Sequence, residues 1–195
     1  MKRLYLLRHG QTEFNVKKLV QGRCDSPLTD LGRQQARAAA AWLKAHSVVP
    51  DKVVSSPLGR AMDTASLVAC ELLGPDAAVE PCEGIIERCY GSFEEGPHDA
   101  LPTGVWDPGE DLVPFGGEGS CALQERMVGA LTNLMGSEGI ETLLAVSHGS
   151  ASRQFIKAAA PEGFELPTKL PNCAIMIFGF DDAREEDDTP QCKFT

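Results

Sequence analysis

Short apolar runs alternate along the chain with longer segments in which apolar residues recur every three or four positions. Arg3–Leu7, Lys52–Ser55 and Thr142–Ser147 are mainly apolar and have the length of buried strands. Ala174–Phe180 has the pattern of a last strand, and Ala77–Glu80 that of a short one. Because strands and helical segments follow one another in turn, the pattern predicts an α/β fold with a mainly parallel central sheet. With helices on both faces of that sheet, the expected fold is a three-layer α/β/α sandwich.

Local signals at the helix starts support the predicted helices. Thr29 is an N-cap candidate for a helix that ends near His46. Ser56 is a second cap candidate, because Pro57 follows it at the favoured first position of a helix. The polar segment 11–27 is expected to be a loop. The four predicted helices span about 29–46, 56–73, 121–135 and 149–160.

Nothing in the sequence divides the chain. We find no internal repeat and no linker, so residues 1–195 are expected to form a single domain. Residues 91–119 are rich in glycine, proline and acidic side chains and predict a loop or lid inserted into that domain. Residues 181–195 predict an acidic tail. Arg8 and His9 break the apolar run near the amino end, so we expect no signal peptide and no membrane span.

Composition narrows the classes of function. The chain is 43% hydrophobic and 24% charged, which is ordinary for a soluble globular protein. Its formal net charge of -10 argues against non-specific binding to nucleic acid or to an anionic membrane. The seven cysteines show no C-x-x-C pair and no zinc spacing, so we expect reduced thiols in the cytoplasm and no disulfide framework. These cysteines are Cys24, Cys70, Cys82, Cys89, Cys121, Cys173 and Cys192.

Two histidines directly follow predicted strands. Arg8 and His9 come after the first strand, and Ser147, His148 and Gly149 surround the end of a later one. Ligands of parallel α/β sheets bind beyond the carboxyl ends of the strands. The two histidines are therefore expected to face one crevice.

The longest motif is Leu7-Arg8-His9-Gly10-Gln11-Thr12-Glu13-Phe14-Asn15, and it resembles the signature of the histidine phosphatase superfamily, also called the phosphoglycerate mutase-like family. Further segments resemble the family's motifs in the same order, over roughly residues 1–180. They are Gln21-Gly22-Arg23, Pro27-Leu28-Thr29 leading to Gly32, Ser55-Ser56-Pro57-Leu58-Gly59-Arg60-Ala61 with Thr64, Glu87-Arg88-Cys89-Tyr90-Gly91 with Glu95-Gly96, Val146-Ser147-His148-Gly149, and Asn172.

The same residues make chemical sense for phosphoryl transfer without a metal or cofactor. Arg8 and Arg60 can each grip two phosphoryl oxygens as planar forks, and a protonated His148 would add a third cation. A neutral His9 can attack phosphorus with its lone pair, and nearby arginines help to keep it neutral. By resemblance, Glu87 is the acid that protonates the leaving oxygen and then the base that activates water.

Other candidates for the site are less distinctive. Asn15 either donates its amide to the phosphoryl group or only caps a turn. Gln21, Gly22 and Gly149 are candidates for substrate contact, with plain loop residues as the alternative for the first two. Three other glutamates, Glu83, Glu94 and Glu95, lie close to Glu87 in sequence. Trp106 and Phe115 either line the pocket or anchor the loop.

The predicted function is a phosphomonoesterase that acts on a small soluble phosphate ester. Residues 91–120 contain no Lys or Arg to bind a second acidic group, which argues against a phosphoglycerate mutase. The sequence around Glu87 and Arg88 resembles the mutase motif more closely than the phosphatase motif, so a phosphoglycerate mutase stays the alternative. Arg88 either binds a distal acidic group or, as favoured here, pairs with an acidic neighbour on the surface. Gly119 stands where the family usually has serine, which puts that serine's role in doubt.

A noncatalytic phosphate-binding protein on the same fold is the alternative from another class. We expect a monomer or a homodimer.

Overall fold

The computed structural model describes residues 1–102, 107–161, 164–165, 169–181 and 193–194. Within these residues, six strands form one sheet in the order β3-β2-β4-β1-β5-β6. The strands are β1 (Lys2–Arg8), β2 (Lys52–Ser55), β3 (Glu80–Pro81), β4 (Thr142–Ser147), β5 (Ile175–Asp181) and β6 (Lys193–Phe194). The helices are α1 (Glu13–Lys17), α2 (Asp30–Ala45), α3 (Gly59–Leu73), α4 (Ser120–Met135) and α5 (Gly149–Ala159).

The four strands β3, β2, β4 and β1 run parallel, whereas β5 is antiparallel to β1 and β6 to β5. In the β1–β4 register, Arg8 lies opposite Ser147. The two strands therefore end side by side, and the residues that follow them emerge at one edge of the sheet. The predicted α/β fold with a mainly parallel sheet is confirmed.

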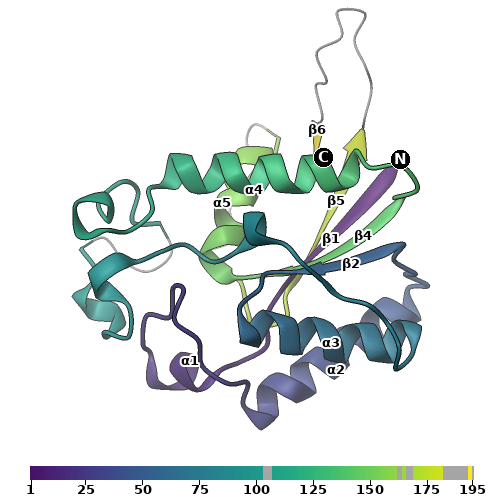
Figure 1. Cartoon of the computed structure of the whole chain (residues 1–195), viewed down its shortest axis with the longest axis horizontal. Helices are drawn as coiled ribbons and strands as arrows, with labels where there is room; N and C mark the ends of the chain where they lie inside the picture. Colours follow the sequence, from purple (N-terminus) through teal and green to yellow (C-terminus); the bar gives the residue numbers. More distant parts are fainter. Residues whose placement is uncertain (103–106, 162–163, 166–168, 182–192, 195) are drawn as a thin grey trace, which may run out of the picture.

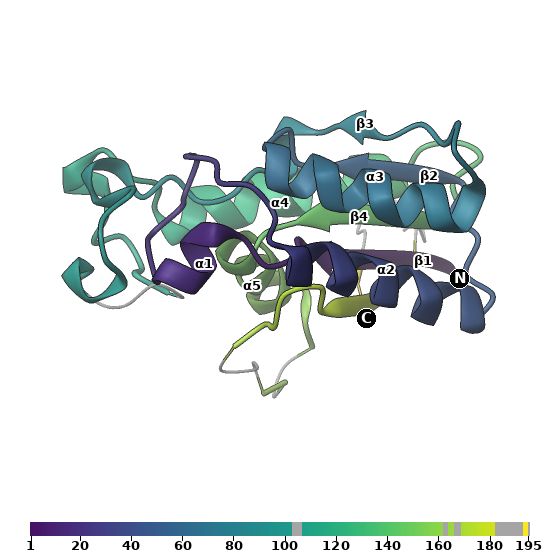
Figure 2. The same cartoon turned by 90° about the horizontal axis from the view of Figure 1, so that it is seen from below.

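Alternating residues of β1 serve two separate cores, as the period of two in a strand requires. Leu4 and Leu6 pack with residues of α4 and α5 on one face. Tyr5 and Leu7 pack with α2 and α3 on the other. Figure 1 shows these helix pairs above and below the sheet, and Figure 2 shows α2 and α3 lying along it from the other direction.

Of the two predicted N-caps, one is confirmed and the other is wrong. Thr29 caps α2, because its side chain accepts a hydrogen bond from the Gly32 N–H. The second helix begins at Gly59 with Leu58 as its N-cap, so Ser56 is not the cap that the sequence predicts. The Ser56 hydroxyl instead lies 2.7 Å from Nε2 of His148, and this contact between distant segments prevails over the local cap signal.

The predicted loops hold more regular structure than expected. Inside 11–27, Thr12 and Asn15 form a reciprocal capping box that starts the short helix α1. Segment 91–119 contains the 3-10 turns η2 (Gly91–Phe93), η3 (His98–Ala100) and η4 (Val113–Phe115). The predicted strand 77–80 is reduced to Glu80–Pro81, since only these two residues pair with β2. Of the expected acidic tail beyond Asp181, only the short strand β6 lies within the described residues.

The described parts of segment 91–119 (91–102 and 107–119) lie against α1 at the carboxyl edge of the sheet, as Figures 1 and 2 both show. Leu19 and Pro97 form an isolated antiparallel bridge between the two segments. Val20 and Leu112 belong to a small apolar cluster of their own beside this bridge. The segment therefore covers the edge where β1 and β4 end.

Within the described part of the chain, no helix has both the length and the apolar character needed to cross a membrane.

Candidate active site

His9 directly follows β1, and its imidazole lies at the carboxyl edge of the sheet. Its backbone N–H donates to the Ser147 carbonyl (2.9 Å), which continues the β1–β4 pairing by one step. Ring atom Nδ1 lies 2.7 Å from the Gly10 carbonyl oxygen. Because a carbonyl oxygen only accepts, Nδ1 carries the proton of the neutral ring and Nε2 keeps its lone pair. The His9 side chain thus has the form that a nitrogen nucleophile requires.

Close backbone packing holds this ring in place. A Cβ on Gly10 would lie 2.5 Å from the Gly32 carbonyl oxygen, and one on Gly32 would lie 2.1 Å from the Gln11 oxygen. The Gly10 N–H also donates to Oγ1 of Thr64 on α3 (3.0 Å). The loop after β1 therefore fits between α2 and α3 only because both positions are glycine.

The surroundings of His9 favour its neutral form. Burial lowers the pKa of His9 well below its usual value, and the charges of Arg60 and Arg8 lower it further. The hydrogen bond to Gly10 opposes this shift but is a smaller effect. Near neutral pH the Nε2 lone pair is consequently available.

Arg60 lies in the first turn of α3 and is 1% exposed. Its Nη2 donates to the Gly22 carbonyl (2.7 Å), and its Nη1 donates to the Cys24 carbonyl (2.8 Å) and to Oδ1 of Asp25 (3.1 Å). Its Nε is buried and has no hydrogen-bond partner. Loop 22–25 therefore fixes the guanidinium and leaves one N–H that a ligand oxygen can satisfy.

Arg8 approaches the same place from the end of β1. Its Nη1 donates to the Leu170 carbonyl, which ties the guanidinium to the segment before β5. Burial lowers the pKa of Arg8, and the Glu87 carboxylate opposes that shift. The two arginines thus bring positive charge to one region, where the Glu87 carboxylate acts on both of them and Asp25 pairs with Arg60.

Backbone N–H groups hold the Glu87 carboxylate. Its Oε1 accepts from the N–H of Arg88 (2.8 Å) and Ala151 (2.9 Å), and its Oε2 accepts from Ser150 (3.3 Å). The last two donors belong to the first turn of α5, where N–H groups lack partners within the helix. Glu87 is 7% exposed and fixed at the end of a helix that begins directly after β4.

The neighbouring glutamates occupy different environments. Glu94 accepts hydrogen bonds from the backbone N–H groups of Arg23, Cys24 and Tyr90, so it supports the loop beneath Arg60. Glu83 is exposed on the turn η1 (Glu83–Ile85). Of the glutamates weighed from the sequence, Glu87 alone is among the residues that line the cavity beside His9.

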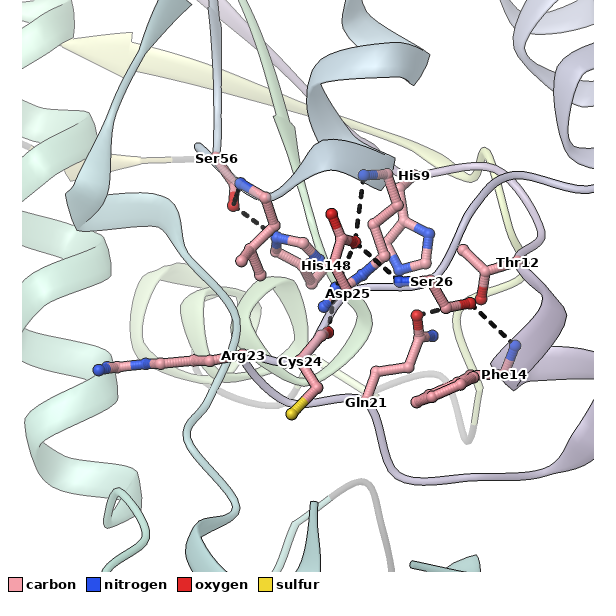
Figure 3. Close-up of polar contacts among 12 residues, drawn as sticks. His9, Thr12, Phe14, Gln21, Arg23, Cys24, Asp25, Ser26, Ser56 and His148 are labelled. Carbon is pink, nitrogen blue, oxygen red and sulfur yellow. Dashed lines mark hydrogen bonds and ion pairs between the residues drawn. The ribbon is translucent and has the colours of Figure 1, made fainter. Parts of the chain in front are cut away.

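His148 is a direct neighbour of His9 but is not among the residues that line the cavity. The two ring centroids are 5.2 Å apart with their planes tilted by 57°, and Figure 3 shows the rings side by side. Burial lowers the pKa of His148 well below its usual value, and the charges of Arg60 and Arg8 add to this effect. The free protein therefore holds a neutral His148, whereas the sequence argument considered a protonated one.

Asn15 and Gln21 both have fixed side chains at the cavity. Asn15 Oδ1 accepts from the Thr12 N–H (3.2 Å) and from Nδ2 of Asn172 (3.0 Å), so its own amide N–H groups stay available. Asn172 also donates to the His9 carbonyl (3.1 Å). Gln21 Oε1 accepts from the Thr12 hydroxyl (3.1 Å). Asn15 thus combines the turn-capping role with a position from which it can donate.

A small cavity of about 60 Å³ brings these side chains together. All the site residues predicted from the sequence line it, with the exception of His148. Five lining residues were not predicted: Leu19, Val20, Tyr90, His98 and Ser150. Ser150 stands one residue after Gly149 and could have been found from the helix start, but the other four depend on how segments 18–20 and 90–98 meet.

Arg88 has neither of the roles considered from the sequence. It is 0% exposed, and its Nε donates to Ser150 Oγ (3.1 Å) and its Nη2 to Ser120 Oγ (2.9 Å). Its Nη1 donates to the carbonyls of Gly109 (3.2 Å) and Glu118 (3.0 Å). The guanidinium is thus a buried link between segment 109–120 and α5, and each of its three nitrogens already donates to a protein acceptor.

Three more residues considered from the sequence, Trp106, Phe115 and Gly119, belong to segment 91–119. Phe115 is 47% exposed and packs edge-on against Phe93, with centroids 5.0 Å apart, so it anchors the segment and does not line the cavity. Trp106 lies outside the described residues. A Cβ on Gly119 would lie 1.8 Å from Oε2 of Glu110, so the exposed Glu110 side chain would have to move to admit a serine here.

Comparison with known proteins agrees with this geometry. The family model of the histidine phosphatase superfamily (branch 1) matches residues 4–189. The probable phosphoglycerate mutase GpmB of Cronobacter sakazakii (strain ATCC BAA-894) is 33% identical over 185 residues, which cover 90% of this chain and 83% of that protein. The broad-specificity phosphatase of Saccharomyces cerevisiae (strain ATCC 204508 / S288c) is 32% identical over 158 residues, which cover 80% of this chain and 69% of that protein.

Among solved structures, the mycobacterial glucosyl-3-phosphoglycerate phosphatase in complex with VO3 superposes with a TM-score of 0.80 at 26% identity. The match covers 100% of this chain and 98% of that one. Relatives thus include proteins named as phosphatases and as mutases.

Proposed function

Because this chain belongs to the histidine phosphatase superfamily, we propose that it hydrolyses a small phosphate monoester through a phosphohistidine on Nε2 of His9. The observation that carries the proposal is the state of that ring: Nδ1 is bonded to the Gly10 carbonyl, and the neutral ring borders a cavity shared with Arg8, Arg60 and Glu87. A lone pair, two cations and a carboxylate are the parts that phosphoryl transfer to nitrogen requires.

In the first step, Nε2 of His9 attacks phosphorus in line with the ester oxygen, so the N–P bond forms as the P–O bond breaks. Arg8 and the unpartnered Nε of Arg60 bind the equatorial oxygens, on which negative charge accumulates. A protonated Glu87 gives its proton to the leaving alkoxide, which departs as the alcohol.

In the second step, the ionised Glu87 takes a proton from water as the water oxygen attacks phosphorus. The N–P bond breaks, inorganic phosphate leaves, and His9 returns to its neutral form. The sum of the two steps is ester plus water giving alcohol plus phosphate. These steps use only side chains of this chain, so we propose a mechanism that is independent of metals and cofactors.

Hydrolysis is favoured over a mutase reaction by Arg88. A phosphoglycerate mutase must hold a substrate that carries a carboxylate besides its phosphate, and Arg88 is the cation nearest to Glu87 in the sequence. Its three nitrogens all donate to protein acceptors, as described above. Residues 91–120 offer no Lys or Arg in its place. A mutase remains the second candidate, because a relative that is 33% identical carries that name.

The decisive experiment measures phosphate release from a panel of small phosphate esters, with and without a chelator, beside an assay for isomerisation of 3-phosphoglycerate. We expect chelator-resistant release that His9→Asn abolishes. His46→Asn is the matched control, because His46 is exposed and stacks on Trp42 far from the cavity. Isomerisation with little release would make this protein a mutase. Phosphate binding without any phosphohistidine would make it a noncatalytic binding protein.

A further inference from the structure

The hydrogen-bonding partners of His148 are unusual for a fully buried imidazole. Its Nε2 lies 2.7 Å from the Ser56 hydroxyl oxygen, while Nδ1 is buried and has no hydrogen-bond partner. Figure 3 shows Ser56 on one side of the His148 ring and His9 on the other. Since burial and the nearby positive charges keep this ring neutral, only one of its two nitrogens carries a hydrogen. Which nitrogen carries it decides whether His148 can donate to an anion.

The contacts of Ser56 decide between the two tautomers. Its Oγ already accepts a hydrogen bond from the Leu58 N–H (3.4 Å), and the side chain is 0% exposed. If Nε2 of His148 donated to Ser56, the hydroxyl hydrogen would have no acceptor among the described residues, and Nδ1 would be an unused acceptor. If the hydroxyl donates to Nε2, the only unpaired group is the N–H at Nδ1. Fewer buried polar groups are left unsatisfied in the second arrangement.

We propose that Ser56 sets the tautomer of His148: its hydroxyl donates to Nε2, so that Nδ1 carries the ring hydrogen and donates it to a phosphoryl oxygen. The first part rests on contacts within the free protein. The second part rests on the proposed function, because the phosphoryl group on His9 is the acceptor. Ser56 is in this sense a positioning residue, which acts on the reaction through His148.

This role explains the late start of α3. A serine that capped the helix would accept from an N–H of its first turn with the hydroxyl aimed along the helix. The α3 N-cap is Leu58, which makes no side-chain hydrogen bond, and the Ser56 hydroxyl contacts His148 instead. The start of α3 thus has no side-chain cap, because the Ser56 hydroxyl bonds to His148 instead.

The direct test is nitrogen NMR of the histidine rings in the free protein. The chain has four histidines, and two of them supply internal references. His9 bonds to a carbonyl through Nδ1, and His98 bonds to the Leu19 carbonyl through Nε2 (3.0 Å), so they represent opposite tautomers. We expect His148 to show the same tautomer as His9. A His148 spectrum like that of His98 overturns the proposal without the need for any variant.

Variants separate the effect of the hydroxyl from general stability. Ser56→Ala should move His148 toward the tautomer with hydrogen on Nε2 and lower kcat/KM about tenfold, the effect of one lost hydrogen bond. Ser56→Thr should retain both properties. Ser55→Ala is the matched control, because Ser55 is equally buried and its hydroxyl donates to the Ser56 carbonyl (2.9 Å) without reaching His148.

An unchanged His148 spectrum in Ser56→Ala would show that another group sets the tautomer. If Ser56→Ala does not fold, the wild-type spectrum and Ser56→Thr still decide. A wild-type protein that shows the expected tautomer but hydrolyses no ester would contradict the proposed function while the role of Ser56 stands.

Discussion

Glu94 supports the loop that holds Arg60, so its removal should weaken phosphate binding although Glu94 itself does not line the cavity. Its Oε1 accepts from the backbone N–H groups of Arg23 (3.1 Å) and Tyr90 (2.9 Å). Its Oε2 accepts from the N–H (3.2 Å) and the thiol (3.2 Å) of Cys24. The Cys24 carbonyl in turn accepts from Nη1 of Arg60 (2.8 Å). One carboxylate therefore connects the loop to the segment after Glu87.

Gly22 also connects Glu94 to Arg60, because it packs against the Glu94 carboxylate and its carbonyl contacts the guanidinium. Its φ is +55°, and a Cβ there would lie 2.2 Å from Oε1 of Glu94. The Gly22 carbonyl accepts from Nη2 of Arg60 (2.7 Å). The loop thus adopts a conformation that suits glycine, packed directly against the carboxylate, with two of its carbonyls turned toward the guanidinium.

Glu94→Ala removes the acceptor of three backbone N–H groups, two of them half-buried. Each hydrogen bond to a charged group contributes about 1.5 to 3 kcal/mol, and water replaces part of that at an accessible loop. We therefore expect the ordered loop to lose about 2 to 3 kcal/mol. If most of this loss is transmitted to Arg60, the inhibition constant for inorganic phosphate rises about 30- to 100-fold. The free energy of global unfolding should fall by less than the loop loses, and Tm should drop by about 2 to 4 °C for each kcal/mol of that fall.

The assay is competitive inhibition of ester hydrolysis by inorganic phosphate, with a thermal unfolding curve for each variant. Glu110→Ala is the matched control, because Glu110 also accepts a backbone N–H, that of Cys121 (3.0 Å), but does not contact loop 22–25. Glu94→Gln keeps one acceptor oxygen and should fall between wild type and Glu94→Ala. A variant Glu94→Ala that loses thermal stability but binds phosphate as tightly as wild type would refute the link to Arg60.

Three further predictions concern the acid, the buried arginine and the effect of pH. Glu87→Gln should slow esters with poor leaving groups far more than esters with good ones, and equal losses would assign the proton to another group. Arg88→Met should lower the free energy of unfolding by about 3 kcal/mol, because four hydrogen bonds are lost. The variant should keep the wild-type preference among substrates with and without a second acidic group, and a changed preference would show that Arg88 binds the substrate. Burial depresses the pKa values of His9 and His148 in the folded protein, so the unfolded chain binds protons at a higher pH than the folded one. The free energy of unfolding should therefore fall as pH drops below about 6.5, by up to about 1.4 kcal/mol per pH unit for each ring. Urea unfolding at several pH values checks this, and a His148→Gln variant with the wild-type slope would contradict it.

The sheet and the two histidines could be predicted because their signals are local. β4 has the bounds predicted from its apolar run, and the following His148 must emerge at the carboxyl edge. The same holds for His9 after β1. Arg60 follows for a similar reason, since the first turn of a helix after a parallel strand lies at that edge.

Other features depend on contacts between distant segments, which local signals do not reveal. Arg88 is buried because acceptors at positions 109, 118, 120 and 150 converge on it. Nothing near position 88 indicates this, and an arginine is ordinarily expected at the surface. Ser56 carries a strong local cap signal, but its partner stands 92 residues away in sequence. Glu94 was a candidate acid from proximity to Glu87, whereas its donors come mainly from positions 23 and 24.

His148 is neutral in the free protein, whereas the sequence predicts it as a third cation. Both statements hold if the ring gains a proton when an anion binds. Apart from burial, the charges of nearby arginines, Arg60 and Arg8 among them, lower the pKa of His148. A bound tetrahedral dianion offsets that charge and accepts from Nδ1, so it should raise the pKa of His148. The Ser56 hydroxyl must then accept from the protonated Nε2, which leaves its own hydrogen unpaired, so the bound anion has to offset that cost as well.

Sulfate tests this idea, because it stays dianionic near neutral pH and brings no proton of its own. Calorimetric titration of the protein with sulfate, in two buffers of different ionisation enthalpy, measures the protons taken up on binding. We expect uptake that grows as pH falls from 8 to 6 and that His148→Gln abolishes. His98→Gln is the control, since His98 also lines the cavity but is hydrogen-bonded to the Leu19 carbonyl. Unchanged uptake in His148→Gln would assign the proton to another group, and His148 would then act only as a neutral donor in every state of the reaction.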